Sequence, residues 1–579
     1  MAPQSPFNLQ QTMQDAVALH QQGRLREAEK LYARVLKAAP GTFDALHLLG
    51  LAKAQAGQMG EAQRLMASAL KINAKAPDAW MNFANVLHAL KRDAEALDAL
   101  DKALALQPGN LDALHNRGNA LLALGRPQDA LVCFEQVLAG NPRHGDAFLN
   151  RGSAHAALGR NEQALADFDA AFVLMPCHPA ALYNRGNALS ALGRYEEAIA
   201  AFDRALAAAP NHMNAWNNRG RALQSLNRHA DALASFGRAI ALQKDYADAQ
   251  LNQALSLLTL GDLAHGFEQY EWRWKRTGMT DARRGYGKPL WLGEYPLARK
   301  TILLHAEQGL GDTIQFARYA PLLARAGARV VLEVQPELKN VLAGLEGVAS
   351  CHARGEKLAP YDVHCPLGSL PLALKTQPGN IPAEIPYLRA DEVHLAKWRA
   401  RLAALPGKRV ALAWAGNVSH ANDRNRSIDL KLLEPLLALE GVSFLSIQRE
   451  LRGDDAELLA RHGNVSHLGG ELTDMADTAA VVALADLTIS VDTSVVHLAG
   501  SLGRPVWVML PFAPDWRWTP ARDPEKWEPV FGKDHAQTKE SDEHSPWYPQ
   551  ARLFRQNALG DWPGAIATLR AELARFTAA

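Results

Sequence analysis

The pattern of apolar positions changes near residue 300. Up to about residue 276, apolar residues recur three and four positions apart, as on one face of an α-helix. From residue 300 onward, short β-branched runs alternate with stretches at helical spacing, which predicts parallel strands joined by helices. The predicted parts are a helical solenoid at 1–276, a linker at 277–299, an α/β lobe at 300–405 and a second α/β lobe with a terminal helix at 406–579.

The helical part repeats with a fixed period. Glycines at positions 118, 152, 186 and 220 stand 34 residues apart, and alanines and aromatic residues keep the same step. Within one period, Gly118 and Ala130 are small enough for two helices to approach closely, and Phe134 fills the space between them. This pattern resembles the tetratricopeptide repeat family, with seven units from about residue 9 to 246 and a weaker eighth unit at 247–275.

A column of asparagines follows the same step. Each asparagine stands two residues before the small packing residue of its helix, so the column points to the exposed, inner face of the solenoid. A carboxamide donates and accepts hydrogen bonds together, which suits binding of an extended peptide; alternatively, asparagine is simply tolerated on a solvated face. The arrangement resembles the asparagine ladder of the protein O-GlcNAc transferases, which implies a protein or peptide acceptor. The predicted acceptor-binding residues are Asn82, Asn116, Asn150, Asn184, Asn218 and Asn252.

The end of the repeat array is strongly aromatic. Residues 267–274 read FEQYEWRW, unlike the matching stretch of any earlier unit. Because a solenoid needs a polar cap or a docking partner at each end, we expect Trp272 and Trp274 to pack the last helix onto the next domain.

The first lobe begins with a strand, a glycine-containing loop, a helix and a second strand. The strands are expected at Thr301–Ala306 and Arg329–Val334, and the helix at Thr313–Ala326. The loop contains Gln308, Gly309, Gly311 and Asp312. It lies at the carboxyl end of a parallel strand, where open α/β sheets bind their ligands.

The second lobe contains a strand that ends in polar residues. Asp492 follows the predicted strand Leu487–Val491, and Thr493 and Ser494 open the next helix. The free N–H groups and the dipole of such a helix end suit a phosphate, and His497, about one turn further on, offers another donor. The alternative is an ordinary helix cap with His497 in the core.

These segments together resemble the heptosyltransferase-like glycosyltransferases of GT-B architecture. The resemblance covers about residues 300–557 and is closest to bacterial proteins that fuse this domain to tetratricopeptide repeats. It rests on the Gly309 to Asp312 loop, on Trp414 to Asn417 with Arg424 and Arg426 downstream, and on 492–500.

The resemblance implies inverting, metal-independent transfer from a nucleotide diphosphate sugar, with Asp312 as the base. Gln448, at a strand end, either contacts the nucleotide or only ends the strand, and Arg424 is alternatively a solvated charge. The expected donor-binding residues are Gln308, Gly309, Gly311, Asn417, Arg424, Arg426, Gln448, Asp492, Thr493, Ser494 and His497.

Two further groups of residues are interpreted structurally. The tryptophans of the long loop at 511–549 are expected to order a lid with some contact to donor or acceptor. The pairs Cys351-His352 and His364-Cys365 lie on predicted strands, where neighbours point to opposite faces, so neither pair is well placed to chelate an ion. We expect no metal site and no cofactor beyond the donor substrate. The terminal helix at 562–576 is expected to cross back onto the first lobe.

Composition and charge exclude other classes of protein. Lys and Arg total 62 against 61 Asp and Glu, so a formal net charge of +1 gives no field that favours nucleic acid. The four cysteines are too few for a disulfide framework and suit a reducing compartment. No stretch reaches the roughly 20 apolar residues of a spanning helix, and the first residues lack a secretory signal pattern, so a cytoplasmic protein without a transmembrane segment is predicted.

Two functional hypotheses follow. In the first, the chain is a glycosyltransferase that modifies a protein presented by the repeats, with a lipid-linked or lipopolysaccharide-type glycan as the alternative acceptor. In the second, the chain is an interaction scaffold whose transferase domain is inactive. The presence of Asp312, Arg426, Asp492, Thr493 and His497 at the family's motif positions favours the first hypothesis.

Overall fold

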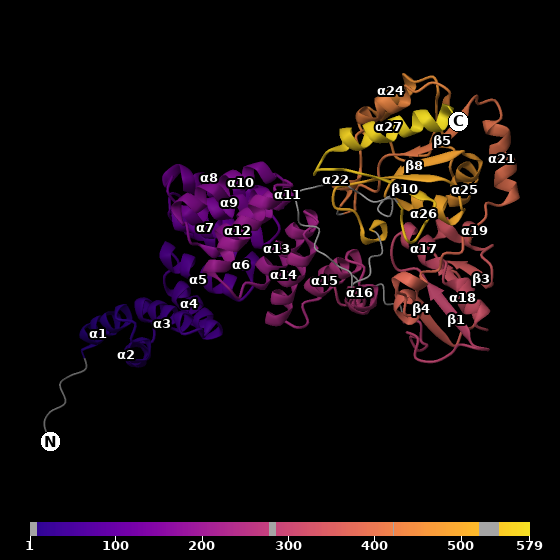
Figure 1. Ribbon diagram of the computed structural model, residues 1–579. Helices are drawn as coiled ribbons and strands as arrows, with labels where there is room; N and C mark the ends of the chain where they lie inside the picture. The colour runs from indigo at the N-terminus through magenta and orange to yellow at the C-terminus, as the bar shows by residue number, and fades with distance from the viewer. Residues whose placement is uncertain (1–7, 277–284, 421, 520–543, 579) are drawn as a thin grey trace. The chain divides into compact units, whose positions relative to one another are not determined.

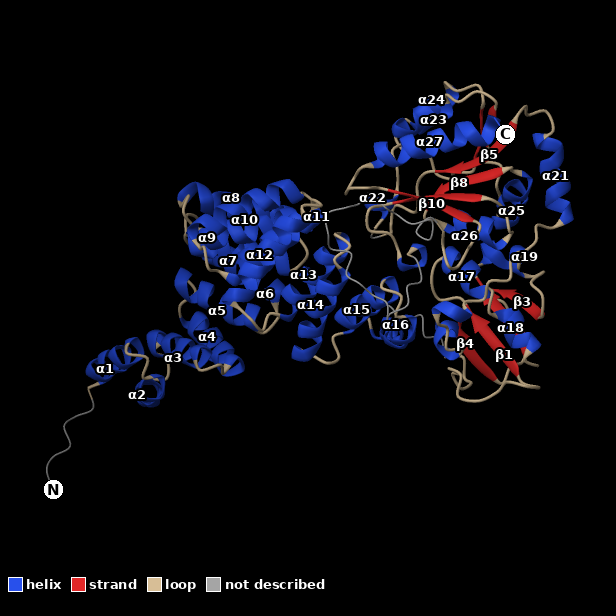
Figure 2. Cartoon of the chain, in the orientation of Figure 1, coloured by secondary structure: helices blue, strands red, loops and turns tan. Residues whose placement is uncertain are grey.

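The computed structural model describes residues 8–276, 285–420, 422–519 and 544–578. The chain forms two compact units, Met1–Ala215 and Trp216–Ala579. Helices make up the first unit, whereas the second combines helices with two parallel sheets (Figures 1 and 2). Among the helices of the described residues, none has both the length and the apolar character that a bilayer crossing requires.

The first unit consists of helices that alternate between 13 and 14 residues in length. The next helix, α13 (Met213–Ser225), contains the boundary between the two units. The helices of the first unit are α1 (Leu9–Gln21), α2 (Leu25–Ala38), α3 (Phe43–Gln55), α4 (Met59–Ile72), α5 (Pro77–Ala89), α6 (Asp93–Leu106), α7 (Leu111–Ala123), α8 (Pro127–Gly140), α9 (Gly145–Ala157), α10 (Asn161–Leu174), α11 (Pro179–Ala191) and α12 (Tyr195–Ala208).

The repeat prediction is confirmed in its packing. A β-carbon at Gly118 would stand 2.5 Å from Cε1 of Phe134, so only glycine allows this ring to lie against α7. The same contact recurs one period later, between Gly152 and Phe168, where the distance would be 2.7 Å. In each of these repeats, the glycine of one helix and the phenylalanine of the next therefore pack directly against each other.

The second unit begins with further helices of the repeat type: α14 (His229–Leu242), α15 (Ala247–Thr259), α16 (Leu263–Tyr270) and the short 3₁₀ helix η1 (Glu271–Lys275). Phe267 and Tyr270 belong to the same buried apolar cluster as the first α/β lobe. Trp274 is buried as well, whereas Trp272 is half-buried beneath the Lys275 ammonium. The aromatic end of the array therefore docks onto the next domain through Phe267 and Tyr270, whereas the contacts of Trp274 with Glu271 and Arg273 lie within η1.

The first sheet has four parallel strands in the order β3-β2-β1-β4. Chain order therefore reverses between β1 and β4. The strands are β1 (Thr301–His305), β2 (Arg329–Val334), β3 (Val348–Ala353) and β4 (Val363–Pro366); the helices are α17 (Leu310–Ala317), α18 (Ala320–Arg325), η3 (Pro336–Leu338), α19 (Lys339–Leu342), η4 (Leu367–Ser369), α20 (Leu370–Ala373) and η5 (Pro378–Asn380).

The second sheet has six parallel strands in the order β10-β9-β8-β5-β6-β7, so its chain order reverses between β5 and β8. The strands are β5 (Lys408–Ala413), β6 (Val442–Ser446), β7 (Val465–His467), β8 (Leu487–Val491), β9 (Val506–Leu510) and β10 (Ala551–Arg555). The helices are α21 (Glu392–Leu402), α22 (Asp423–Arg426), η6 (Leu430–Leu433), α23 (Glu434–Leu437), α24 (Asp455–Ala460), α25 (Met475–Leu484), α26 (Ser494–Ser501), η7 (Trp516–Trp518) and α27 (Trp562–Ala578).

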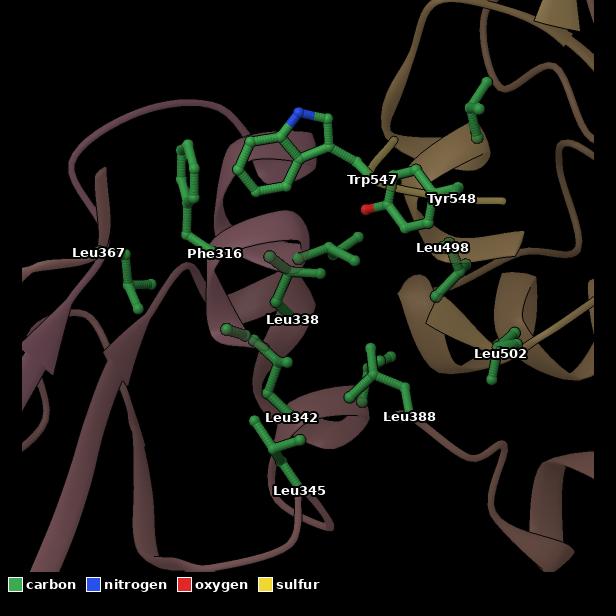
Figure 3. Close-up of a cluster of buried hydrophobic side chains, with 14 of the residues drawn as sticks. Phe316, Leu338, Leu342, Leu345, Leu367, Leu388, Leu498, Leu502, Trp547 and Tyr548 are labelled. Carbon is green, nitrogen blue, oxygen red and sulfur yellow. The ribbon is translucent and has the colours of Figure 1, made fainter. Parts of the chain in front are cut away.

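One buried apolar cluster joins the two lobes. It includes Phe316 and Leu342 of the first lobe and Leu498, Trp547 and Tyr548 of the second, which face one another in Figure 3. A second cluster lies on the other side of the second sheet, beneath α27. The lobes are therefore packed together through apolar side chains.

Three expectations about the elements need correction. The first-lobe helix begins at Leu310 rather than Thr313 because Gly309 is the N-cap, and it ends at Ala317 before α18 begins. The terminal helix α27 packs on β10 and η6 of the second lobe and does not cross to the first. Helix α21, placed by the predicted boundary in the first lobe, packs against α25, where Trp398 donates to Asp477 at 2.7 Å.

Two predicted loops are only partly described. Residues 277–284 of the linker and 520–543 of the long loop lie outside the described residues. The rest of the linker packs on the first sheet, where the Tyr286 ring lies 4.2 Å from the His305 ring and Trp291 is buried. These residues therefore belong to the first lobe.

Candidate active site

The predicted motifs lie at the reversal points of the two sheets. The loop 306–309 follows β1, next to β4, and in the second lobe residues 414–417 follow β5, while Asp492 follows β8. Ligands of open α/β sheets bind in the crevice outside the carboxyl ends of the strands at such points. Both lobes thus present their predicted residues where a ligand site is expected.

The structure brings the first-lobe loop against the second-lobe helix. Helices α17 and α26 are in contact along their first turns. A β-carbon at Gly311 would stand 3.3 Å from Nε2 of His497 and 3.5 Å from Cα of Ser494. Residues that stand almost 190 positions apart in the sequence therefore form opposite walls of one site.

Asp312 occupies the third position of α17. Its Oδ2 accepts a hydrogen bond from the Gly309 amide at 3.0 Å, and its Oδ1 accepts one from Nη2 of Arg517 at 2.5 Å. The side chain is 25% exposed, so it is not closed off from solvent. Each carboxylate oxygen has two lone pairs, and these two contacts leave acceptor capacity for a proton.

Arg517 is a central residue that the sequence reading missed. Its guanidinium also donates to Gln315 Oε1 at 2.5 Å and to Asp515 Oδ1 at 2.8 Å, and it lies over the Trp516 ring. Burial opposes its charge, but Asp515 and Asp312 outweigh burial and raise the pKa of Arg517 above its ordinary value. Arg517 is therefore a permanent cation beside the candidate base.

Asp492 and Arg426 form the second-lobe side of the site. Arg426 donates from Nη1 to the Asp492 carbonyl at 3.2 Å, and it lies against Gly416, where a β-carbon would stand 2.5 Å from Nη2. Burial, together with the Asp515 carboxylate, raises the pKa of the Asp492 side chain to about 6. The Nε atom of Arg426 is buried and has no hydrogen-bond partner among the described residues.

The start of α26 differs in detail from the predicted cap. Thr493 is the N-cap residue, but its hydroxyl pairs with Ser490 Oγ at 3.1 Å instead of capping the helix. His497 is buried, its Nδ1 lies 3.1 Å from the Tyr548 hydroxyl, and its ring faces Trp518. Burial, with Arg517 nearby, holds the pKa of His497 well below its ordinary value, so the ring is neutral.

Three of the predicted donor-binding residues, Gln448, Gln308 and Asn417, make hydrogen bonds within the protein. Gln448 accepts from the Trp414 and Ala415 amides at 3.2 and 3.1 Å, so it fixes the turn after β5. Gln308 accepts from the Tyr270 hydroxyl at 3.0 Å, and its Nε2 is buried without a partner among the described residues. Asn417 closes a local turn by accepting from Ser419.

A pocket of about 370 Å³ opens beside the turn after β5. Trp414, Arg424, Lys431, Arg452 and Asp455 are among its lining residues. Its volume lies within the roughly 300–1,000 Å³ that small-molecule sites usually occupy. Arg424 thus lines a pocket close to Arg426 in the chain, although its side chain is exposed.

Glu307 is a second residue that the sequence reading missed. It precedes Gln308, its side chain is 2% exposed, and it accepts from the Gly368 amide at 3.1 Å. Burial raises the pKa of Glu307 to about 7, although Arg273 opposes the shift from 3.2 Å. Its position just after the end of β1, two residues before Gly309, was the available signal.

The asparagine column has a structural role that the sequence did not reveal. All six residues are half-buried. Asn150 donates to Asn119 at 2.8 Å and approaches His115 at 3.0 Å, and Asn252 donates to Asn217 at 3.0 Å. Asn150 and Asn252 therefore tie their repeats to the preceding ones.

The predicted histidine and cysteine pairs lie on strands β3 and β4 of the first sheet. Nε2 of His305 and Nδ1 of His364 lie 3.1 Å apart, and Cys365 is buried on the neighbouring face. Over the part of the chain that the structure covers, no three His, Cys, Asp or Glu side chains are arranged to hold a metal ion.

Comparison with known families supports the repeats directly. The tetratricopeptide repeat family matches residues 75–142, 115–174, 179–212 and 217–271. A family described as anaphase-promoting complex, cyclosome, subunit 3 matches residues 21–103. The N-terminal region is therefore an array of tetratricopeptide repeats.

Individual relatives match parts of the chain. Protein FlbA of Caulobacter vibrioides is 27% identical over 354 residues, which cover 56% of this chain and 54% of FlbA, so the chain spans about half the length of that relative. A tetratricopeptide repeat protein from Parabacteroides merdae is 19% identical, with a TM-score of 0.37, over 43% of this chain and 98% of that chain. YrrB, described as a TPR protein with an unusual peptide-binding site, is 27% identical, with a TM-score of 0.28, over 32% of this chain and 95% of that chain.

Proposed function

We propose that this protein is an inverting, metal-independent glycosyltransferase of GT-B architecture. In this proposal it moves a sugar from a nucleotide diphosphate sugar to a protein acceptor held by the repeats. The observation that carries the proposal is the contact of Gly311 with His497 and Ser494, which places a carboxylate loop and a helix N-terminus face to face. One wall of that site supplies a base and the other supplies donors for a phosphate.

In the proposed reaction, Asp312 accepts the proton of an acceptor hydroxyl. The hydroxyl oxygen forms a bond to the anomeric carbon while the bond between that carbon and the phosphate oxygen breaks. The nucleoside diphosphate leaves from the opposite face, so the configuration at the anomeric carbon inverts. The electron pair of the broken bond remains on the leaving diphosphate, whose charge must be stabilised.

Two cations are placed to stabilise that charge. Arg426 donates to the Asp492 carbonyl just after β8, and its buried Nε makes no hydrogen bond among the described residues, although Asp423 Oδ1 lies 3.9 Å from it. Arg517 donates a hydrogen bond to the Asp312 carboxylate, close to where the sugar would bind. The first-turn amides of α26 add the dipole of a helix N-terminus. The pocket that includes Trp414 and Arg424 is assigned to the nucleoside.

Binding and transfer measurements test the proposal. The purified full-length protein is titrated with uridine and adenosine diphosphate sugars by calorimetry, and donor hydrolysis and transfer to peptide acceptors are then followed. We expect one nucleotide to bind with a Kd in the micromolar range and donor turnover to depend on Asp312. If the protein binds none of these nucleotides, the proposal that it is a glycosyltransferase is wrong.

A second candidate function is a repeat scaffold with an inactive transferase domain. It is favoured by the engagement of both Asp312 oxygens, one by Gly309 and one by Arg517. Under this alternative, peptide partners bind the repeats and no donor is turned over. Donor turnover by the purified protein separates the two candidates.

A further inference from the structure

The last repeat reaches the residues that precede Asp312. Tyr270, the final residue of α16, donates from its hydroxyl to Gln308 Oε1 at 3.0 Å. Three residues later, Arg273 donates to Glu307 Oε1 at 3.2 Å and to Ser369 Oγ at 2.6 Å. Arg273 is only 3% exposed, so these contacts are made in the interior of the protein.

The same contacts extend along the loop to α17. Gln335 donates to the Gln308 carbonyl at 2.8 Å and accepts from the Thr313 hydroxyl at 3.0 Å. A β-carbon at Gly368 would stand 2.5 Å from Oε1 of Glu307 and 3.0 Å from Nε2 of Gln308, so these side chains fit closely against η4. These contacts link the last repeat, through the loop, to the first turn of α17.

The last repeat also supports the residue on the other side of Asp312. The rings of Phe267 and Trp516 meet edge to face, with centroids 5.5 Å apart. Trp516 immediately precedes Arg517, which donates to Asp312. The loop after β1 and the turn η7 therefore both reach Asp312. Each of these two segments also contacts the end of the repeat array.

We propose that Tyr270 and Arg273 are positioning residues of the transferase site. They act through Gln308 and Glu307 to hold Asp312 in place, so the last repeat is a functional part of the transferase. This inference rests on the proposed function. Because neither residue touches the second-lobe donor site, their loss lowers turnover and leaves donor affinity unchanged.

The test uses the full-length protein with three variants. Arg273→Gln removes the charge, Arg273→Lys keeps it, and Tyr270→Phe removes one hydroxyl while preserving the buried ring. Arg276→Gln is the matched control for arginine, since Arg276 pairs with Asp248 at the surface. Tyr295→Phe is the control for tyrosine, since Tyr295 is 40% exposed.

Hydrogen exchange of residues 306–317 and transfer kinetics are the two readouts. Since a displacement of about 1 Å at a catalytic group costs on the order of 100-fold in rate, we expect about 10- to 100-fold lower kcat for Arg273→Gln and a smaller loss for Tyr270→Phe. Exchange in 306–317 rises, the donor KM stays within about twofold, and Arg273→Lys recovers part of kcat.

The outcomes separate the two proposals. Unchanged exchange in 306–317 overturns the positioning role, and so does faster exchange with wild-type kcat. A higher donor KM with wild-type kcat also overturns it. If the wild-type protein binds no nucleotide, the proposed function fails, while the exchange data still decide whether the last repeat holds the loop. Tyr270→Phe covers the case in which Arg273→Gln does not fold.

Discussion

Gly311 and His497 belong to different lobes and lie in direct contact. A β-carbon at position 311 would stand 2.7 Å from Cδ2 of the imidazole. Tyr548 and Trp518 pack against the same histidine ring, so it has little freedom to retreat. The absence of a side chain at 311 thus sets how closely the two walls of the site approach.

Replacing Gly311 with alanine tests this contact. The new methyl group forces a shift of the His497 ring or of α17, which we expect to cost about 1–3 kcal/mol of unfolding free energy and to lower kcat/KM. Chemical denaturation and donor turnover measure the two effects. Gly344→Ala is the control, because a β-carbon there meets no atom within 4 Å. If Gly311→Ala and Gly344→Ala have the same unfolding free energy and the same donor turnover, the contact between Gly311 and His497 is not tight.

Asp312→Asn tests the candidate base. The carboxamide oxygen can still accept from the Gly309 amide, but the side chain can no longer take up a proton at the working pH. We expect transfer to fall by about 100- to 10,000-fold with an unchanged nucleotide Kd. Asp391→Asn makes the same change at the N-cap of α21, far along the chain, and should leave turnover intact. Substantial turnover by Asp312→Asn would assign the base to another residue.

Arg426→Gln tests the diphosphate site. A charge-assisted hydrogen bond contributes about 1.5–3 kcal/mol, which corresponds to roughly 10- to 150-fold in affinity. We therefore expect weaker binding of the nucleoside diphosphate in calorimetry. Arg399→Gln, at an exposed position on α21, is the control. If Arg426→Gln binds the nucleoside diphosphate with wild-type affinity, Arg426 does not contact the phosphates.

Glu307 makes stability depend on pH. Burial raises its pKa from 4.5 to about 7, so between these values the folded protein holds a proton that the unfolded chain releases. This contribution is complete below pH 4.5 and is lost as the pH rises through 7, with a slope of at most about 1.4 kcal/mol per pH unit.

Glu307→Gln removes that dependence. Denaturation of both proteins at several pH values gives the difference in unfolding free energy, in which other titrating groups cancel. Asp492, whose pKa is raised to about 6, keeps its own contribution of the same sign in the variant. If the unfolding free energies of the two proteins change with pH in the same way, the pKa of Glu307 is not raised in the folded protein.

Under the proposed function, the asparagine column affects the binding of acceptor peptides but not the binding of nucleotide. In the double variant Asn150→Ala and Asn184→Ala we expect weaker binding of acceptor peptides and an unchanged nucleotide Kd. Loss of the inter-repeat hydrogen bonds costs about 1 kcal/mol each in addition, visible as a lower Tm. Gln136→Ala removes an exposed carboxamide from α8 and is the control. Wild-type peptide affinity in the double variant would limit the column to a structural role.

The sequence predicts those features that depend on neighbours in the chain or on a period. The repeat helices follow from the fixed 34-residue step, because each glycine meets a phenylalanine 16 residues later. The loop at 308–312 and the start of α26 follow from glycines and cap residues at strand ends. The strands β7 and β10 are not predicted, because one has three residues and the other follows a long loop.

Contacts between distant residues escape the sequence reading. Arg517 stands between two tryptophans and reads as part of an aromatic loop, yet its partner Asp312 lies 205 residues earlier. The asparagine hydrogen bonds depend on the stagger between successive repeats, which a periodic pattern does not specify. The raised pKa of Glu307 depends on its burial. That burial involves η1, the loop after β1 and η4, which are far apart in the sequence.

The boundary between the compact units lies within α13, at Ala215 and Trp216, and not at the end of the repeats. Repeats before that point can be gained, lost or exchanged without touching Tyr270, Arg273 or the loop that they hold. A junction at residue 276 would separate these residues from Gln308 and Glu307. Under the proposed function, recombination upstream of Trp216 would exchange acceptor-binding repeats while keeping the last repeat with the α/β lobes, and chimeric proteins are best joined there.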